Sequence, residues 1–156
     1  MRFSLFVMVM MAAPLPVWAD EAAILREGIE GCYTTVGEDA TVTHDLMFET
    51  FGWEGDTDPE MGLGFLYPQQ DSQVFITLAL DGSFCQVESA TIDSATASEH
   101  LRHVLDQFGQ EVEYDKDEMG CTRLNLGDGY AVTITSGGND PTCGSDENSA
   151  LRFTSE

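Results

Sequence analysis

Two histidines one helical turn apart form the most evident chemical pair in the sequence. His100 and His103 lie in a segment with helical periodicity, with Glu99 and Asp106 close by. Imidazole and carboxylate groups on one turn are ligands for a transition metal. Two imidazoles do not complete a site, and the spacing turns His103 toward solvent. The pair therefore predicts an exposed polar helix face, and we expect no metal or other cofactor.

An acidic segment offers a second kind of chemistry. Asp56, Asp58 and Glu60 alternate within GDTDPEMG, as oxygen ligands do in a calcium loop. This segment has no glycine at the sixth loop position. Its twelfth position is Tyr67, where a calcium loop has glutamate. Solvated turns are the expectation, with calcium binding as an alternative. A second oxygen-rich stretch contains Asn139, Asp140, Asp146 and Glu147.

The sequence contains no recognisable catalytic set. There is no G-x-S-x-G elbow and no glycine-rich phosphate loop, and His44 has no matching partner. Carboxylate pairs for hydrolysis cannot be singled out among 28 acidic residues. We therefore expect a protein without enzymatic activity, and a hydrolase acting through acidic residues is the alternative.

The first residues predict export. A short apolar run at 3–13 follows Arg2, and Val17 and Ala19 suit the −3 and −1 positions of a signal-peptidase site. Residues 1–19 are expected to be a signal peptide, and residues 20–156 a single domain in the periplasm or outside the cell. An even count of four cysteines in that domain favours two disulfides.

Charge excludes several partners. The chain has 28 Asp and Glu against 6 Lys and Arg, which gives a formal net charge of −22. Such a surface repels nucleic acid and anionic membranes and favours basic partners or cations. It also keeps an exported protein well solvated.

An internal repeat organises the rest of the chain. Residues 61–85 align with 119–143 at a fixed offset of 58, without a gap, and Met-Gly follows acidic residues in both copies. The matches fall at turn glycines and at alternating strand positions. We expect two repeats, at about 42–92 and 95–154. Further matched pairs are Leu66 with Leu124, Val74 with Val132, Ile76 with Ile134, and Cys85 with Cys143.

Each repeat is predicted to contain a helix and three strands. In the second helix the apolar face is Leu101, Val104, Leu105 and Phe108, with Thr96 as cap. The first helix would be capped by Thr43 and end at Gly52, and a leading helix at 20–30 would end at Gly31. The fold class is α+β, an antiparallel sheet with helices on one face. The expected strands are 63–67, 73–80, 84–92, 122–126, 130–136 and 150–154.

Proximity within the repeats suggests the disulfide pairing. Cys121 and Cys143 both lie in the second repeat, and Cys32 lies just before the first repeat, which contains Cys85. We therefore expect Cys121–Cys143 and Cys32–Cys85.

The two faces of the predicted sheet differ. Val74, Ile76, Leu78 and Leu80 should face the helices, with Val132 and Ile134 in the second repeat. On the opposite face the second repeat is polar, with Cys121, Arg123, Asn125 and Thr133. The first repeat is aromatic there, and either the leading helix covers it through Ala22, Leu25 and Ile29 or a partner does. This candidate binding patch is Leu63, Phe65, Tyr67 and Phe75, extended by Trp53 and Phe84.

A non-enzymatic exported binding module is the function these features favour. It would engage another envelope or secreted protein, as an inhibitor or an accessory subunit. A calcium-dependent structural protein of the envelope is a further alternative. The tandem α/β repeats with paired cysteines resemble the architecture of secreted β-lactamase inhibitor proteins, although no motif of that family is present.

Overall fold

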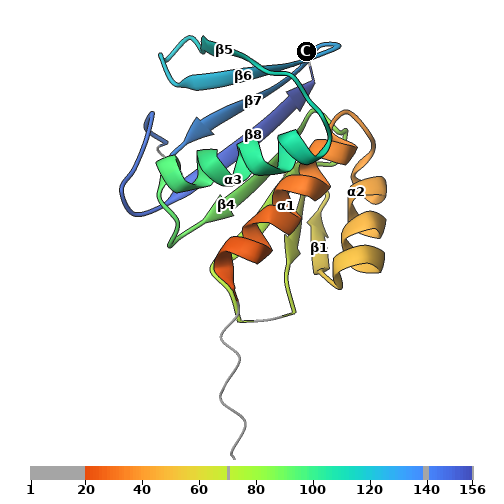
Figure 1. Ribbon diagram of the computed structural model, residues 1–156. Helices are drawn as coiled ribbons and strands as arrows, with labels where there is room; N and C mark the ends of the chain where they lie inside the picture. Colours follow the sequence, from red (N-terminus) through yellow and green to blue (C-terminus); the bar gives the residue numbers. More distant parts are fainter. Residues whose placement is uncertain (1–19, 70, 139–140, 156) are drawn as a thin grey trace, which may run out of the picture.

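A computed structural model describes residues 20–69, 71–138 and 141–155. One eight-stranded antiparallel sheet carries three helices on a single face (Figure 1). The α+β prediction with helices on one face is therefore confirmed. The expected signal peptide, Asn139 and Asp140 lie outside the described residues. Within the described part no helix is long and apolar enough to cross a membrane.

Aspartates begin all three α-helices of the described chain. Helix α1 spans Glu21–Thr35, α2 spans Ala40–Leu46 and continues as a π-helix, η1, over Met47–Phe51, and α3 spans Ser94–Gln107. The side chains of Asp20, Asp39 and Asp93 accept hydrogen bonds from backbone N–H groups of the first turns. Such caps satisfy donors that the helix itself leaves unpaired.

Neither threonine predicted as a cap has that role. Thr43 is buried inside α2, where its hydroxyl lies 2.8 Å from that of Thr35. The N–H of Thr96 donates to Asp93, which is the true cap of α3. The predicted stop at Gly52 is correct, since its φ of 72° ends the π-helix in the left-handed region.

Helix α1 runs through Gly31 instead of stopping there. A Cβ at Gly31 would lie 2.2 Å from the sulfur of Met47, and one at Gly28 would lie 2.7 Å from Cγ2 of Val87. These glycines let the helix approach its neighbours closely. The sequence expectation was wrong because a glycine needed for packing looks like a glycine that ends a helix.

The eight strands form two four-stranded meanders that meet in the middle. The sheet order is β1-β2-β3-β4-β8-β7-β6-β5, so β1 and β5 are the edges. Each half holds one strand more than predicted, because the acidic segments after the helices are edge strands. The bounds are β1 Glu54–Asp58, β2 Leu63–Tyr67, β3 Val74–Ala79, β4 Phe84–Ser89, β5 Glu113–Lys116, β6 Thr122–Gly127, β7 Tyr130–Thr135 and β8 Ser149–Ser155.

The strand register refines the internal alignment. Leu66 pairs with Ile76 across β2 and β3, whereas Leu124 pairs with Val132 across β6 and β7. A gapless alignment would instead place Ile134 opposite Leu124. The hairpin of β6 and β7 is thus two residues shorter than the hairpin of β2 and β3. A register shift of two residues leaves every side chain on the same face of the sheet.

Helices α1 and α3 cover the inner face of the sheet. Leu25 and Ile29 of α1 are fully buried in one core with Ile76, Val132 and Leu151. The side chains expected to face the helices, from Val74 to Ile134, line this core. Helix α1 therefore packs on the aliphatic face, so of the two alternatives the one in which the leading helix covers the aromatic face is wrong.

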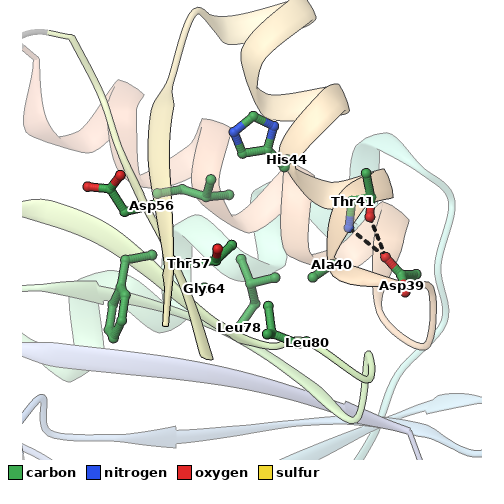
Figure 2. Close-up of a pocket in the computed structure, with 11 residues that line it drawn as sticks. Asp39, Ala40, Thr41, His44, Asp56, Thr57, Gly64, Leu78 and Leu80 are labelled. Carbon is green, nitrogen blue, oxygen red and sulfur yellow. Dashed lines mark hydrogen bonds between the residues drawn. The ribbon is translucent and has the colours of Figure 1, made fainter. Parts of the chain in front are cut away.

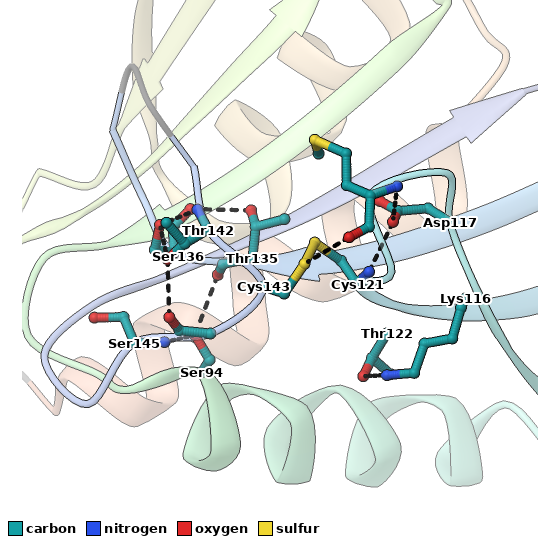
Figure 3. Close-up of a disulfide and its surroundings, with 12 residues drawn as sticks. Ser94, Lys116, Asp117, Cys121, Thr122, Thr135, Ser136, Thr142, Cys143 and Ser145 are labelled. Atoms are coloured by element: carbon teal, nitrogen blue, oxygen red, sulfur yellow. Dashed lines mark hydrogen bonds between the residues drawn. A yellow bond between two sulfur atoms is a disulfide. The ribbon is translucent and has the colours of Figure 1, made fainter.

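Both disulfides join the cysteines expected. Cys32–Cys85 fastens α1 to β4. Cys121–Cys143 fastens the start of β6 to the loop before β8 (Figure 3). Cys143 lies in that loop while Cys85 lies within β4, so the two cysteines aligned in the repeat do not occupy equivalent places.

Candidate functional site

The outer face of the N-terminal half carries an aromatic strip. Leu63, Phe65 and Tyr67 alternate along β2 with buried residues that face the helices, and Phe75 and Phe84 share their face from β3 and β4. The rings of Tyr67 and Phe75 are 6.3 Å apart. Tyr67 is 47% exposed and the other four are half-buried. We call these five residues the open-face strip; no helix of the described chain covers it.

Trp53 does not belong to the strip. It is 1% exposed, and its indole N–H donates to Oε2 of Glu27 in α1 at 3.0 Å. After the left-handed turn at Gly52 the side chain points under α1 rather than outward. Trp53 therefore stabilises the helix layer, and its inclusion in the binding patch was wrong.

Carboxylates border the open-face strip. In the register of β1 and β2, Glu54 lies opposite Tyr67, Asp56 opposite Phe65, and Asp58 opposite Leu63. Directly opposed residues of neighbouring strands share a face. On the other side, Glu88 of β4 lies opposite Phe75. The strip thus has an acidic border at the sheet edge and a further carboxylate beside its centre.

The C-terminal half of the same face is polar and carries arginine. The pairings Gln86–Arg152, Arg152–Thr133 and Thr133–Arg123 run from β4 across β8 and β7 to β6. The guanidinium of Arg152 also lies over the ring of Phe84. Along one row of side chains the face therefore changes from acidic Asp56 through aromatic Phe65 to the two arginines, and the row ends at Asp115 opposite Arg123.

A hollow lies where the arginine region meets the loop before β8. Its volume is about 300 Å³, and Gln86, Thr133 and Arg152 contribute to its lining. Gln86 donates to Oε1 of Glu88 at 2.7 Å, and Oε2 of Glu88 accepts from the N–H of Gly138 at 3.1 Å. These bonds hold the loop against the sheet and place a polar recess next to the strip.

Hydrolysis by carboxylates requires two of them close together in a desolvated site. Among the groups of the described residues whose pKa departs from its ordinary value, there is no such pair. Hydrogen bonds from Thr41, Ser83 and Thr96 lower the pKa values of Asp39, Asp81 and Asp93, respectively. Asp39 and Asp81 are exposed and Asp93 is half-buried, and each caps a helix or a turn. Their shifts reflect local structure rather than catalysis.

The metal candidates of the sequence are engaged in other contacts. His100 Nδ1 lies 3.3 Å from the guanidinium of Arg26, and His103 lies beside Gln107. Asp58 Oδ1 accepts the N–H groups of Glu60 and Met61 in the turn after β1. Across residues 20–69, 71–138 and 141–155, no group of three His, Cys, Asp or Glu side chains is placed to hold a metal ion.

Sequence reasoning did not include Arg152 or the acidic border in the site. The alternation of Glu54, Asp56 and Asp58 has the period of a strand, and that was the available signal. Its interpretation as a loop followed from the absence of apolar residues, which an edge strand does not need.

Comparisons of the chain with models of known protein families, with curated proteins and with solved structures found no match.

Proposed function

We propose that this chain is an exported binding module that engages another protein through the open face of its sheet. The observation that carries the proposal is the open-face strip, Leu63, Phe65, Tyr67, Phe75 and Phe84, on a sheet face that no helix among the described residues covers. Contiguous aromatic surface is characteristic of protein interfaces, where aromatic anchors contribute much of the binding energy.

The charges around the strip favour a basic partner. Glu54, Asp56 and Asp58 stand along one side of it. The whole chain has a formal net charge of −22, which steers cationic proteins toward it and repels acidic ones. The partner surface that fits is apolar at its centre, with Lys or Arg over β1 and a carboxylate over Arg152.

The same charges disfavour a second copy as the occupant. A face-to-face dimer would bring together two chains that each carry this net charge, at a cost that rises as the ionic strength falls. We therefore expect the isolated protein to be monomeric at low salt.

Matched surface variants test this function. Phe65→Ser removes an aromatic side chain from the strip, and Phe48→Ser removes one from the π-helix η1, where Phe48 is 54% exposed. The tagged, oxidised protein and both variants are used to capture proteins from the envelope and secreted fractions of its own cells. A candidate partner must bind the unaltered chain and Phe48→Ser but not Phe65→Ser.

The candidate is then purified and titrated by calorimetry. We expect Phe65→Ser to weaken binding at least tenfold, the loss typical of an interface hot spot above about 1.4 kcal/mol. Phe48→Ser should change the affinity less than twofold. Equal weakening by both variants, or binding that Phe65→Ser leaves unaffected, would show that the open face is not the interface.

A further inference from the structure

A second concave surface lies on the other side of the sheet edge, between α2 and strands β1 to β3. We call it the α2 groove. It encloses about 440 Å³ and its floor is apolar, with Leu66, Leu78 and Leu80 below and Ala40 on the helix wall. In Figure 2 the labelled leucines and Ala40 converge on the same space beneath His44. This size and lining are typical of sites for small molecules.

The groove exists because small residues face α2 at this edge. Gly55 lies opposite Leu66, and Thr57 lies opposite Gly64. In the other half of the sheet the corresponding pairs are Tyr114 with Leu124 and Lys116 with Thr122. The edge of the C-terminal half is thus built from long side chains, whereas the N-terminal edge leaves space that no side chain of the described residues fills.

Polar groups stand only around the rim. Thr41 and His44 line it from α2, and Thr57 lines it from β1. The carboxylate of Asp39 stands at the helix end, where the Thr41 hydroxyl and N–H donate to it. Those hydrogen bonds lower the pKa of Asp39, so the carboxylate is ionised at neutral pH.

The charge of the lining selects among apolar ligands. Asp39 and Asp56 both contribute to it, and no lysine or arginine does. Asp56 shares the face of Phe65, so its carboxylate points toward the open face, and Asp39 is the carboxylate on the α2 side of the groove. A ligand with an anionic head would meet the carboxylate of Asp39 without a compensating lysine or arginine in the lining that the described residues provide.

We propose that the α2 groove binds a small molecule with an apolar body and a cationic head group, of the alkylammonium class. The apolar body lies on the leucines and displaces water from the floor. The head group lies at the rim beside Asp39. The floor of this site lies on the helix-bearing side of the sheet, and Phe65 is a residue that it shares with the open-face strip. The site does not depend on the protein partner.

Three detergents with one tail and different heads test the proposal: decyltrimethylammonium, decyl maltoside and decyl sulfate. Each is titrated below its micelle concentration into the oxidised, isotope-labelled protein, and the backbone amide shifts are followed by NMR. We expect decyltrimethylammonium to bind most tightly. Its shifts should be confined to residues 39–44, 55–57, 64–66 and 78–80.

Two variants separate shape from charge. Thr57→Leu fills the groove from an exposed edge position and should abolish binding. Asp39→Asn keeps a good helix cap and should weaken the binding of the cationic detergent by roughly fivefold at low salt, the upper range for an exposed ion pair. Asp81→Asn is the matched control, because Asp81 is also an exposed carboxylate that caps a turn but lies outside the groove. It should leave binding unchanged.

Several results would overturn the proposal. These are equal binding of the maltoside or the sulfate, shifts centred on Tyr67, Phe75 and Phe84 of the open-face strip, or an equal effect of Asp39→Asn and Asp81→Asn. If Thr57→Leu does not fold, the location of the shifts and the two aspartate variants still decide the question.

Discussion

The guanidinium of Arg152 lies over the ring of Phe84, with its central carbon 4.0 Å from the ring centroid. Arg152 pairs with Gln86 in the register of β8 and β4, while Phe84 pairs with Thr154. The contact is therefore diagonal, and it crosses the seam where the two halves of the sheet meet. It joins the aromatic half of the open face to the polar half.

A double-mutant cycle measures this contact. With Arg152→Gln and Phe84→Leu we expect a coupling free energy of about 0.5–1 kcal/mol, the range for an exposed cation–π pair. Urea unfolding of the four proteins provides the measurement. A coupling indistinguishable from zero would mean that the two side chains are adjacent without interacting.

The two disulfides should contribute unequally to stability. Cys32–Cys85 spans 53 residues and Cys121–Cys143 spans 22. Loop-closure entropy predicts a loss of about 4 kcal/mol on replacing the first pair with alanine and about 3 kcal/mol for the second. Urea unfolding of the two double-alanine variants tests the order.

The solvent accessibility of the cysteines predicts which disulfide is reduced first. Cys32 and Cys85 are almost fully buried, whereas Cys143 is exposed. Limited reduction of the native protein followed by alkylation and mass spectrometry should label Cys121 and Cys143 first. Earlier labelling of Cys32 would contradict the burial of the first disulfide.

Close helix packing makes Gly28 sensitive to one added methyl group. A Cβ there would lie 2.7 Å from Cγ2 of Val87 and 3.4 Å from the Trp53 ring. Gly28→Ala should gain up to about 1 kcal/mol of helix propensity and lose about 1–3 kcal/mol to overpacking, so we expect net destabilisation. Chemical denaturation measures it.

The neighbouring variant and a compensating one are the controls. Gly31→Ala meets the sulfur of flexible Met47 and should cost less. Val87→Ala should make Gly28→Ala less harmful, because it removes the clashing methyl groups. A stabilising effect of Gly28→Ala alone would show that the helix moves aside freely.

Local periodicity in the sequence was enough to predict how side chains are oriented within single elements. Alternating Val74, Ile76 and Leu78 indicated the inner face of the sheet, and the spacing of Leu101, Val104 and Leu105 indicated the buried side of α3. Such patterns carry the orientation of a side chain relative to its own element. They were enough for the fold class and for the five residues of the open-face strip, whereas both disulfides were predicted from the proximity of their cysteines within the repeats.

Features that depend on contacts between distant segments were not predictable in this way. Gly31 is a packing glycine only because Met47 lies above it, and Trp53 is buried only because Glu27 and α1 lie over it. The α2 groove arises from the pairing of Thr57 with Gly64. Each needs the relative placement of two elements, which no single window of sequence contains.

Stability should fall when the pH decreases below about 6.5 because of His100. Burial, followed by the positive charge of Arg26, lowers the pKa of His100 below its ordinary value of 6.5, and His103 acts in the same direction. Glu99 and Asp20 oppose the shift. Below pH 6.5 the unfolded chain therefore binds more protons at this site than the folded chain, so the free energy of unfolding decreases as the pH falls.

Urea unfolding between pH 7.5 and 5 tests the histidine. His100→Gln should flatten the pH dependence, and His103→Gln should leave most of it. The capping carboxylates Asp39, Asp81 and Asp93 affect stability in a separate pH range. Because their pKa values are lowered in the folded protein, their protonation reduces the free energy of unfolding only below about pH 3.8. An unchanged slope in His100→Gln would exclude this histidine as the cause.

The acidic border of β1 should keep the sheet edge from associating with other chains. Asp56 and Asp58 lie beside Phe65 and Leu63, so negative charge stands at the sheet edge next to the open-face strip. We expect the double variant Asp56→Val, Asp58→Val to self-associate at micromolar concentrations. Light scattering and sedimentation measure it.

Strand β5 provides the matched control at the opposite edge. Glu113 and Asp115 lie beside the polar residues Asn125 and Arg123, so an apolar edge there has no apolar surface to extend. Glu113→Val, Asp115→Val should therefore remain monomeric under the same conditions. Equal association of the two variants would mean that the edge strands alone govern it. A monomeric β1 variant would mean that twist or the neighbouring loops protect the edge without its charges.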